Sequence, residues 1–391
     1  MNKRSFLSAS LTAVALAATA ALPAQAQGTD PVKIGLILPM TGPFASTGRQ
    51  IDAAVKLYIA QHGSTVAGRK VEVVLRDDAG TPDQTRRIAQ ELVVNEKVSV
   101  LAGFGITPAA LAVGPVATQA KVPAVIMAAA TSGIVATSPY FVRTSYTLPQ
   151  TSATMADWAA RNNQKKVVTM VSDYGPGIDA EKSFKERLKA VGGEVLAEVR
   201  VPIRNPDFAP FLQRVRDLKP DAVFVFIPSG PAVALMKQFV ERGMDKAGIK
   251  LIGDGGVTDD DTLNEMGDVA LGTVTSFHYS ASHDSAVNKK FVDAFVAANK
   301  FRPNFMAVGG YDGMHAIYQG LEATKGKSDG DTLVAAMKGL GFESPRGPIS
   351  IDAQTRDIVQ NIYIRKVERK NGQLWNTEIE TFKAVKDPRA Q

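Results

Sequence analysis

The sequence predicts an α/β fold of two lobes, each built around a parallel sheet. From Val32 onward, short β-branched and apolar runs alternate with longer helical patterns, which is typical of parallel strands covered by helices on both faces. The alternation starts again at Lys166. Each run is too long for a solenoid repeat and has the length of an α/β domain. We therefore expect two Rossmann-like lobes of the flavodoxin type.

The elements follow in order along the chain. The first run predicts strands at Val32–Leu38, Lys70–Arg76, Val98–Ala102 and Ala124–Met127, with helices at Gly48–Gln61, Pro82–Asn95 and Pro108–Ala120. The second predicts strands at Lys166–Val171, Glu194–Val201, Ala222–Ile227 and Lys250–Ile252, with helices at Gly177–Val191, Phe208–Leu218 and Pro231–Arg242. The last third predicts a strand at Gly272–Phe277, helices at Ala286–Lys300, Gly309–Thr324 and Asp331–Gly339, and a hairpin at Val359–Phe382.

The C-terminal third must complete both lobes, so a hinge of several strands is expected between them. We assign residues 27–147 and 279–357 to lobe 1, and residues 148–278 and 358–391 to lobe 2. The space between two hinged lobes is a natural ligand cleft. Ligands of open α/β sheets bind beyond the carboxyl ends of the strands, so the loops after the strands are the candidate site.

The N-terminus predicts export. Basic Lys3 and Arg4 precede an apolar stretch at Phe6–Leu22 and the small-residue triplet ending at Ala26, the pattern of a signal peptide at residues 1–26. The alternative, a membrane anchor, is disfavoured by serines and threonines within the stretch and by Pro23 at its end. The chain contains no cysteine, which excludes disulfides, thiolate metal sites and a lipid-modified cysteine. We expect a protein of a Gram-negative periplasm.

Several chemical motifs are incomplete. The segment Gly320–Ser328 has one residue too many between its glycines for a phosphate-binding loop. Four scattered histidines, with no GxSxG turn, give little support to the alternative of a periplasmic hydrolase. The run Asp259-Asp260-Asp261 could bind metal or complement a helix dipole, and the dipole is the favoured interpretation. Basic residues form no block, which argues against a nucleic-acid partner.

Two hydroxyl-bearing loops predict a carboxylate site. Thr107 follows the predicted strand at Val98–Ala102 and precedes a helix, and Thr131 follows the strand at Ala124–Met127. Because both loops leave the same end of one sheet, the two hydroxyls can grip one anion together with free helix amides. The alternative is that both threonines only cap helices.

At these loops the sequence resembles the branched-chain amino acid-binding protein family, the type I periplasmic binding proteins of ABC importers. The resemblance covers nearly the whole chain after Ala26. Its most specific parts are Ile34–Gly48, Arg76-Asp77-Asp78 with Pro82, Gly103–Pro108, Ala128–Thr131, Ser172–Gly175 and Asp207-Phe208. The resemblance implies a binding protein without catalytic activity or cofactor, a monomer that delivers its ligand to an inner-membrane permease. A sensory domain with the same fold is an alternative, which we disfavour because the sequence ends at Gln391 with no membrane span following the predicted lobes.

The resemblance also implies the residues of the site. Thr107, Ala129 and Thr131 would hold the ligand carboxylate, and Tyr174 would close over it from the second lobe. The first loop would supply a wall made of Phe44 and Thr47.

The sequence departs from the family at one position that concerns the ligand. Amino acid binders carry a glutamate that neutralises the ligand ammonium where this chain has Gly255, preceded by Asp254. Because a buried ammonium without a partner is costly, and because Phe305 and His278 add aromatic surface, we expect an aromatic carboxylate such as benzoate or hydroxybenzoate. A branched-chain amino acid is the alternative.

Overall fold

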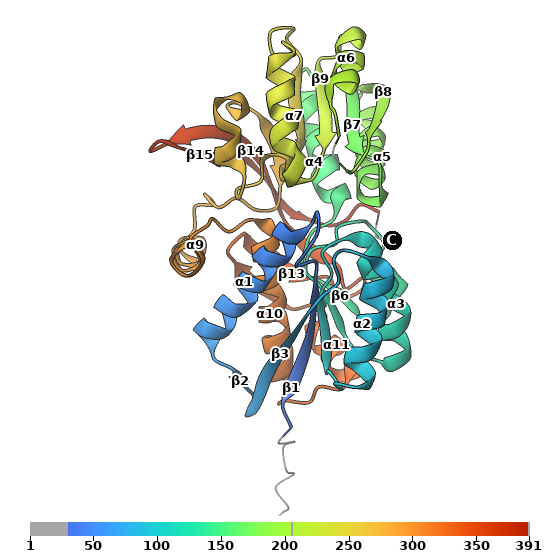
Figure 1. Cartoon of the computed structure of the whole chain (residues 1–391), viewed down its shortest axis with the longest axis vertical. Coiled ribbons are helices and arrows are strands. Elements are labelled where there is room, and N and C mark those ends of the chain that lie inside the picture. The colour runs from blue at the N-terminus through green and yellow to red at the C-terminus, as the bar shows by residue number, and fades with distance from the viewer. Residues whose placement is uncertain (1–29, 205, 390–391) are drawn as a thin grey trace, which may run out of the picture.

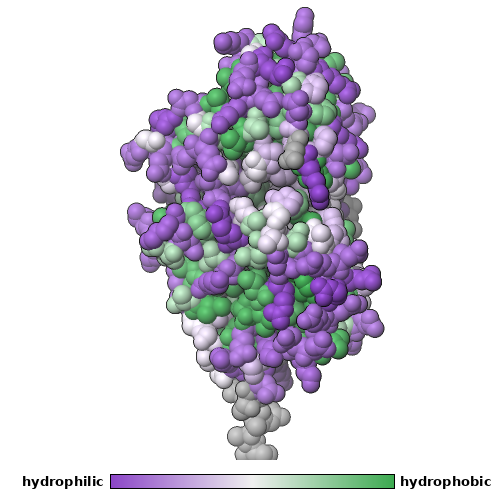
Figure 2. All heavy atoms as spheres, in the orientation of Figure 1, coloured by the Kyte–Doolittle hydropathy of each residue, from purple (hydrophilic) through white to green (hydrophobic). Residues whose placement is uncertain are grey.

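The computed structural model describes residues 30–204 and 206–389, which form two α/β lobes stacked along the long axis of the molecule (Figure 1). The predicted signal peptide lies outside the described residues. Within those residues, no helix is both long enough and apolar enough for a membrane span. Figure 2 shows a mainly hydrophilic face, with apolar residues gathered over the lower, first lobe.

The first lobe contains a six-stranded sheet in the order β2-β3-β1-β4-β5-β6, parallel except for the short β2. Its strands are β1 (Val32–Leu38), β2 (Thr65–Val66), β3 (Arg69–Asp77), β4 (Val100–Gly103), β5 (Ala124–Ile126) and β6 (Phe141–Arg143). One face is covered by α2 (Pro82–Val94) and α3 (Thr107–Ala120), the other by α1 (Ala45–His62) and α10 (Phe305–Ala323), with α11 (Gly330–Met337) beside α10 (Figure 1). Because β1 lies between two helix layers, it is apolar without alternation.

The second lobe contains a nine-stranded sheet in which β8-β7-β9-β10-β11 are parallel and β12 to β15 are antiparallel additions. The parallel strands are β7 (Lys166–Ser172), β8 (Glu194–Val201), β9 (Ala222–Phe226), β10 (Lys250–Asp254) and β11 (Val274–Phe277). The others are β12 (Gly341–Ser344), β13 (Gly347–Ile351), β14 (Ile358–Lys370) and β15 (Gln373–Val385). The helices are α4 (Leu148–Arg161), α5 (Gly175–Ala190), α6 (Ala209–Leu218), α7 (Ser229–Glu241) and α8 (Leu263–Met266), while α9 (Ala286–Asn299) packs against α1. The 3-10 turns η2 (Gly255–Thr258) and η3 (Gly267–Ala270) belong to this lobe, while η1 (Val135–Thr137) precedes β6 in the first lobe.

The predicted α/β alternation agrees with the observed elements, and the C-terminal hairpin is present as β14 and β15. The sequence missed the helices α4 and α8 and the strands β2, β6, β12 and β13. The strand β6 was missed because it has only three residues. The helix α4 was missed because a local capping interaction, rather than a long apolar pattern, marks its start. At the start of α4, the Gln150 side-chain oxygen accepts from the backbone amide of the N-cap residue Thr147 at 3.0 Å.

The chain crosses between the lobes after β6, after β11 and after α11, and buried polar side chains join these crossings. Arg346 is fully buried and pairs with Asp312 of α10 at 2.7 Å. Its Nη1 also donates to the Ser145 carbonyl at 3.0 Å and to Gln360 Oε1 at 2.9 Å. The strands β12 and β13 join the second sheet, although Ile351 of β13 packs in the first-lobe core. The assignment of residues 279–357 to lobe 1 stays a prediction.

Candidate ligand-binding site

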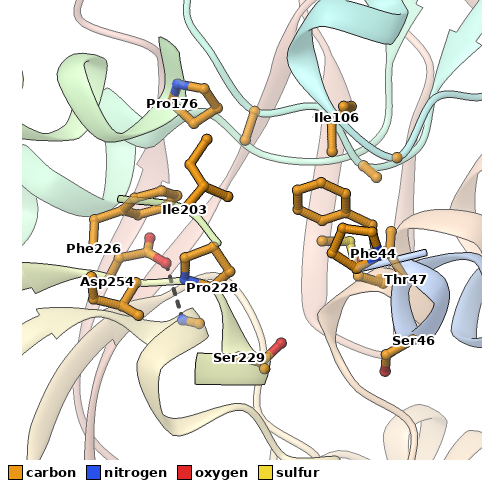
Figure 3. A pocket seen from close by; sticks show the side chains of 18 of the residues that line it. Phe44, Ser46, Thr47, Ile106, Pro176, Ile203, Phe226, Pro228, Ser229 and Asp254 are labelled. Atoms are coloured by element: carbon orange, nitrogen blue, oxygen red, sulfur yellow. Dashed lines mark hydrogen bonds between the residues drawn. The ribbon is translucent and has the colours of Figure 1, made fainter. Parts of the chain in front are cut away.

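A cavity of about 160 Å³ lies between the lobes, at the carboxyl ends of strands from both sheets; we call it the interlobe cavity. The first lobe and the crossing after β6 line it with Pro43, Phe44, Ser46, Thr47, Gly105, Ile106, Ala128, Ala130, Tyr146, Phe305 and Met306. The second lobe lines it with Tyr174, Pro176, Ile203, Phe226, Ile227, Pro228, Ser229, Gly230, Pro231, Asp254 and Gly256. Figure 3 shows the two walls facing each other, with Phe44 and Thr47 opposite Phe226 and Asp254.

Five of the predicted site residues line this cavity: Phe44, Thr47, Tyr174, Asp254 and Phe305. The other five are not lining residues: Thr107, Ala129, Thr131 and Gly255 each adjoin a lining residue in the chain, and His278 stacks on the lining residue Tyr146. The carboxyl ends of the strands therefore bring the predicted residues to one region from both lobes.

The hydroxyls of Thr107 and Thr131 are 2.7 Å apart and hydrogen-bonded to each other. Their neighbours Ile106 and Ala130 line the interlobe cavity. The alternative interpretation, that Thr107 only caps a helix, does not hold, because Ile106 is the N-cap of α3 and Thr107 is its first residue. The hydroxyl of Thr107 is thus not used by the helix amides and bonds Thr131 instead.

A buried arginine that sequence reasoning missed fixes the loop after β5. Arg143 pairs with Asp357 at 2.9 Å, and both side chains are almost fully buried. The Arg143 guanidinium donates to the carbonyl oxygens of Ala129 at 3.2 Å and Thr131 at 2.9 Å. Three-residue β6, which the sequence pattern did not reveal, carries this arginine at its end. The loop that presents Thr131 is therefore held by charge-assisted hydrogen bonds.

The polar group of the second-lobe wall is the Asp254 carboxylate at the end of β10. Its Oδ1 accepts from the Gly256 amide at 3.0 Å (Figure 3), and its Oδ2 accepts from the Thr151 hydroxyl at 2.8 Å. Burial raises the pKa of Asp254 to about 6, against the lowering effect of these hydrogen bonds and of Arg365. At neutral pH, Asp254 is thus a buried anion with room to accept one more hydrogen bond from the cavity.

Two tyrosines stand near this carboxylate. Tyr174 is the N-cap residue of α5, and Tyr146 lies in the crossing after β6. Burial, followed by the negative charge of Asp254, raises the pKa of each phenol above its ordinary value. Both hydroxyls therefore stay protonated at neutral pH and can donate to a ligand or accept from it.

Gly255 is enclosed by the second-lobe core. Its carbonyl oxygen accepts from Arg365 Nη2 at 2.9 Å. A Cβ at this position would lie 2.2 Å from Phe277 Cγ and 2.4 Å from Arg365 Nη2. Since real Cβ atoms do not approach other atoms so closely, no side chain, acidic or otherwise, fits here without displacing the guanidinium.

Aromatic rings fill the region behind the cavity. Tyr146 stacks on His278 with ring centroids 4.5 Å apart, and Phe305 meets Phe277 edge-on at 4.6 Å. Within the described part of the chain, neither ring nitrogen of the fully buried His278 has a hydrogen-bond partner. Burial, together with the charges of Arg346 and Arg365, holds the pKa of His278 well below its ordinary value. His278 is therefore a neutral packing residue that supports Tyr146.

Tyr146, Ile203 and Phe226 line the cavity and were missed from the sequence. Phe226 ends β9 and lies one residue before the end of the predicted strand, so the rule that ligands bind beyond strand ends could have found it. Tyr146 follows the undetected β6, and Ile203 lies in a loop without a motif.

This two-lobed fold with a cleft between the lobes is that of a binding protein, and the chain belongs to the periplasmic binding protein family, whose model matches residues 31–373. It is 47% identical over 383 residues to a Leu/Ile/Val-binding protein homolog 6 of Brucella melitensis, with 97% of each chain covered. The predicted resemblance to this family and the predicted fold class are confirmed.

Two solved structures are also similar. A solute-binding protein of an ABC transporter from Rhodopseudomonas palustris BisB5, in complex with 3,4-dihydroxybenzoic acid, has 64% identity and a TM-score of 0.90, with 92% of this chain and 99% of that chain covered. One from Rhodopseudomonas palustris HaA2, in complex with p-hydroxybenzoic acid, has 43% identity and a TM-score of 0.88, with the same coverage.

Proposed function

We propose that this protein captures a hydroxylated benzoate in the interlobe cavity and delivers it to the permease of an ABC importer. The observation that carries the proposal is one polar group in a largely aromatic and aliphatic cavity: Asp254 and Tyr174 of the second lobe, with Tyr146 of the crossing after β6, both tyrosines neutral. A cavity of about 160 Å³ suits one ring, because a cavity of about 150 Å³ in another protein holds benzene. The similarity to the protein crystallised with 3,4-dihydroxybenzoic acid supports the same ligand class.

The carboxylate of the ligand would lie toward the first lobe, at the Thr107–Thr131 hydroxyl pair. One of the two hydroxyls donates to the other at 2.7 Å, which leaves the second O–H free for an anion. Arg143, buried behind the loop and paired with Asp357, fixes the loop that presents Thr131. The walls in between, Phe44 and Phe305 among them, would sandwich the ring.

A ring hydroxyl would lie toward the second lobe and donate to Asp254. A hydrogen bond to a buried carboxylate is about twice as strong as one between neutral groups. An ammonium at the same place meets a carboxylate that already has two donors and a nearby guanidinium, that of Arg365. Because these groups already interact with the Asp254 carboxylate, it would offset the charge of a buried ammonium less than a free carboxylate would.

A branched-chain amino acid is the second candidate ligand, favoured by the 47% identity to the Leu/Ile/Val-binding homologue. Calorimetric titration of the protein lacking residues 1–26 with 3,4-dihydroxybenzoate, 4-hydroxybenzoate and leucine decides between them. We expect the two benzoates to bind and leucine not to bind. Tight leucine binding that disappears in Asp254→Asn would show that Asp254 pairs with an ammonium, and the proposed ligand class would then be wrong.

The setting of the protein is also proposed. A signal peptide at residues 1–26 would direct it to the periplasm, where it would act as a monomer that docks on an inner-membrane permease through both lobes. The family to which the chain belongs consists of solute-binding proteins, which supports binding and release rather than hydrolysis. Sedimentation of the protein with and without ligand tests the monomer.

A further inference from the structure

The acidic run Asp259–Asp261 lies in the second lobe, yet part of it bonds to the first. Asp261 Oδ2 accepts from Arg49 Nη2 at 2.7 Å and from the Ser46 hydroxyl at 3.0 Å. Ser46 and Arg49 stand in the first turns of α1, whose N-terminal end reaches the boundary between the lobes (Figure 1). Arg49 is also placed by its own lobe, because its guanidinium lies 4.3 Å from the centroid of the Phe301 ring.

Asp259 makes a second bond across the boundary. It is buried, and its Oδ2 accepts from Asn304 Nδ2 at 3.0 Å. Asn304 is the N-cap of α10, where its Oδ1 accepts from the amides of Met306 and Ala307 at 3.0 and 3.3 Å. The same asparagine thus holds the start of α10 and the second lobe together.

The Asp260 carboxylate, in contrast, bonds within its own lobe. It accepts from Asn376 Nδ2 at 3.1 Å, within the second lobe, and this bond anchors the run. Among the described residues, no group of acidic or histidine side chains is arranged to hold a metal ion. Asp259 and Asp261 precede the short α8, and their carboxylates also bond to groups at the N-terminal ends of α1 and α10 in the opposite lobe.

Both bonds end next to residues that line the interlobe cavity. Ser46 and its neighbour Thr47 line it from α1, and Phe305 and Met306, which follow the N-cap of α10, line it beside them. Helices α1 and α10 pack against each other on one face of the first sheet. The two aspartates therefore bond the second lobe to the packed pair of helices α1 and α10, which carries much of the cavity wall.

We propose that Asp259 and Asp261 form an interlobe clasp, which positions the α1 and α10 wall of the cavity and slows ligand release. The clasp rests on the proposed function, because it acts on the same cavity. Arg49 is about half exposed, and exposed ion pairs contribute modestly. We expect loss of the Asp261 bonds to speed ligand dissociation about two- to fivefold.

The kinetic test compares Asp261→Asn with a matched control, Asp52→Asn. The Asp52 carboxylate also forms an ion pair at 2.7 Å, but its partner is Lys56 of the same helix α1. This ion pair therefore does not connect the two lobes. Stopped-flow dissociation of 3,4-dihydroxybenzoate should accelerate in Asp261→Asn and not in Asp52→Asn, while the melting temperatures of the two ligand-free variants change alike. Arg49→Gln should add little to Asp261→Asn, since both remove one interaction. Additive effects, or equal dissociation rates in Asp261→Asn and the wild type, would contradict the clasp.

A distance measurement separates the clasp from the ligand assignment. Because the chain has no cysteine, Gln90→Cys on α2 and Lys189→Cys on α5, both exposed, would carry two unique spin labels on opposite lobes. Asp261→Asn should shift the interlobe distances to longer values. Identical distributions in both proteins, with 3,4-dihydroxybenzoate and without it, would overturn the clasp. A wild type that does not bind the benzoate would overturn the ligand class, while the distances of the free protein still test the clasp.

Discussion

Replacing Asp254 by asparagine should stabilise the ligand-free protein and weaken its ligand binding. Burial raises the pKa of this fully buried carboxyl from 3.8 to about 6. A shift of roughly two units corresponds to about 3 kcal/mol at 1.36 kcal/mol per unit. Asparagine keeps most of the shape and does not carry the buried charge, so Asp254→Asn should gain up to about 3 kcal/mol in free energy of unfolding at pH 8.

The sign of the pH dependence follows from the raised pKa. Between about pH 4 and pH 6 the folded protein keeps the Asp254 proton that the unfolded chain releases. The contribution of Asp254 to stability is therefore intact below about pH 4 and falls as the pH rises to about 6. The difference between wild type and Asp254→Asn should be small at pH 4 and largest above pH 6.

The same substitution, Asp254→Asn, should weaken ligand binding although it stabilises the ligand-free protein. A ring hydroxyl that donates to the carboxylate contributes roughly 1.5–3 kcal/mol, so Asp254→Asn should lose about ten- to 150-fold in affinity for 3,4-dihydroxybenzoate. Urea unfolding at pH 4 and pH 8 measures stability, and calorimetry measures affinity. The control is Thr151→Val, which removes a donor to Asp254 but keeps the charge and should destabilise the protein. An Asp254→Asn variant that is less stable at pH 8, or that binds the ligand unchanged, would refute the reasoning.

Three further outcomes are expected. Thr107→Ala and Thr131→Ala should each weaken binding of 3,4-dihydroxybenzoate by roughly ten- to 150-fold in calorimetry, with a smaller effect on ligand-free melting; unchanged affinity in both would remove the carboxylate assignment. Gly255→Ala should cost about 3 kcal/mol in urea unfolding, because its Cβ would lie 2.4 Å from Arg365 Nη2, whereas Gly256→Ala, with a nearest contact of 3.3 Å, should cost far less. Small-angle scattering should show a smaller radius of gyration with ligand than without, and identical profiles would argue against lobe closure.

The parts of the fold that follow from local pattern were predictable. The strand β1 is buried on both faces, so its apolar run identified it. The pairing of Thr107 with Thr131 followed from the same logic, because both residues succeed strands that are neighbours in the sheet. The antiparallel additions to the second sheet were not predictable beyond a hairpin, since their pairing joins segments far apart in the chain.

The details of the site depend on tertiary contacts that no local pattern contains. Gly255 was expected to face the ligand, but Arg365 and Phe277 enclose it from other strands of the second sheet. His278 was expected among the contacts and instead lies behind Tyr146, in stacking contact with it. A single sequence shows which residues leave the strand ends, but not which of two adjacent residues turns toward the cleft.

The interleaving of the lobes also bears on how the protein folds as it is made. The six strands of the first sheet are complete at Arg143, but α10, which covers one of its faces beside α1, begins only at Phe305. Until that helix is synthesised, apolar residues on one face of the first sheet stay uncovered. They belong to the core that Ile317 and Leu321 of α10 complete in the finished protein. Such a sheet cannot settle into its final packing. The first lobe should therefore finish folding after the second has been synthesised, and a truncated chain ending before α10 should aggregate rather than yield half a protein.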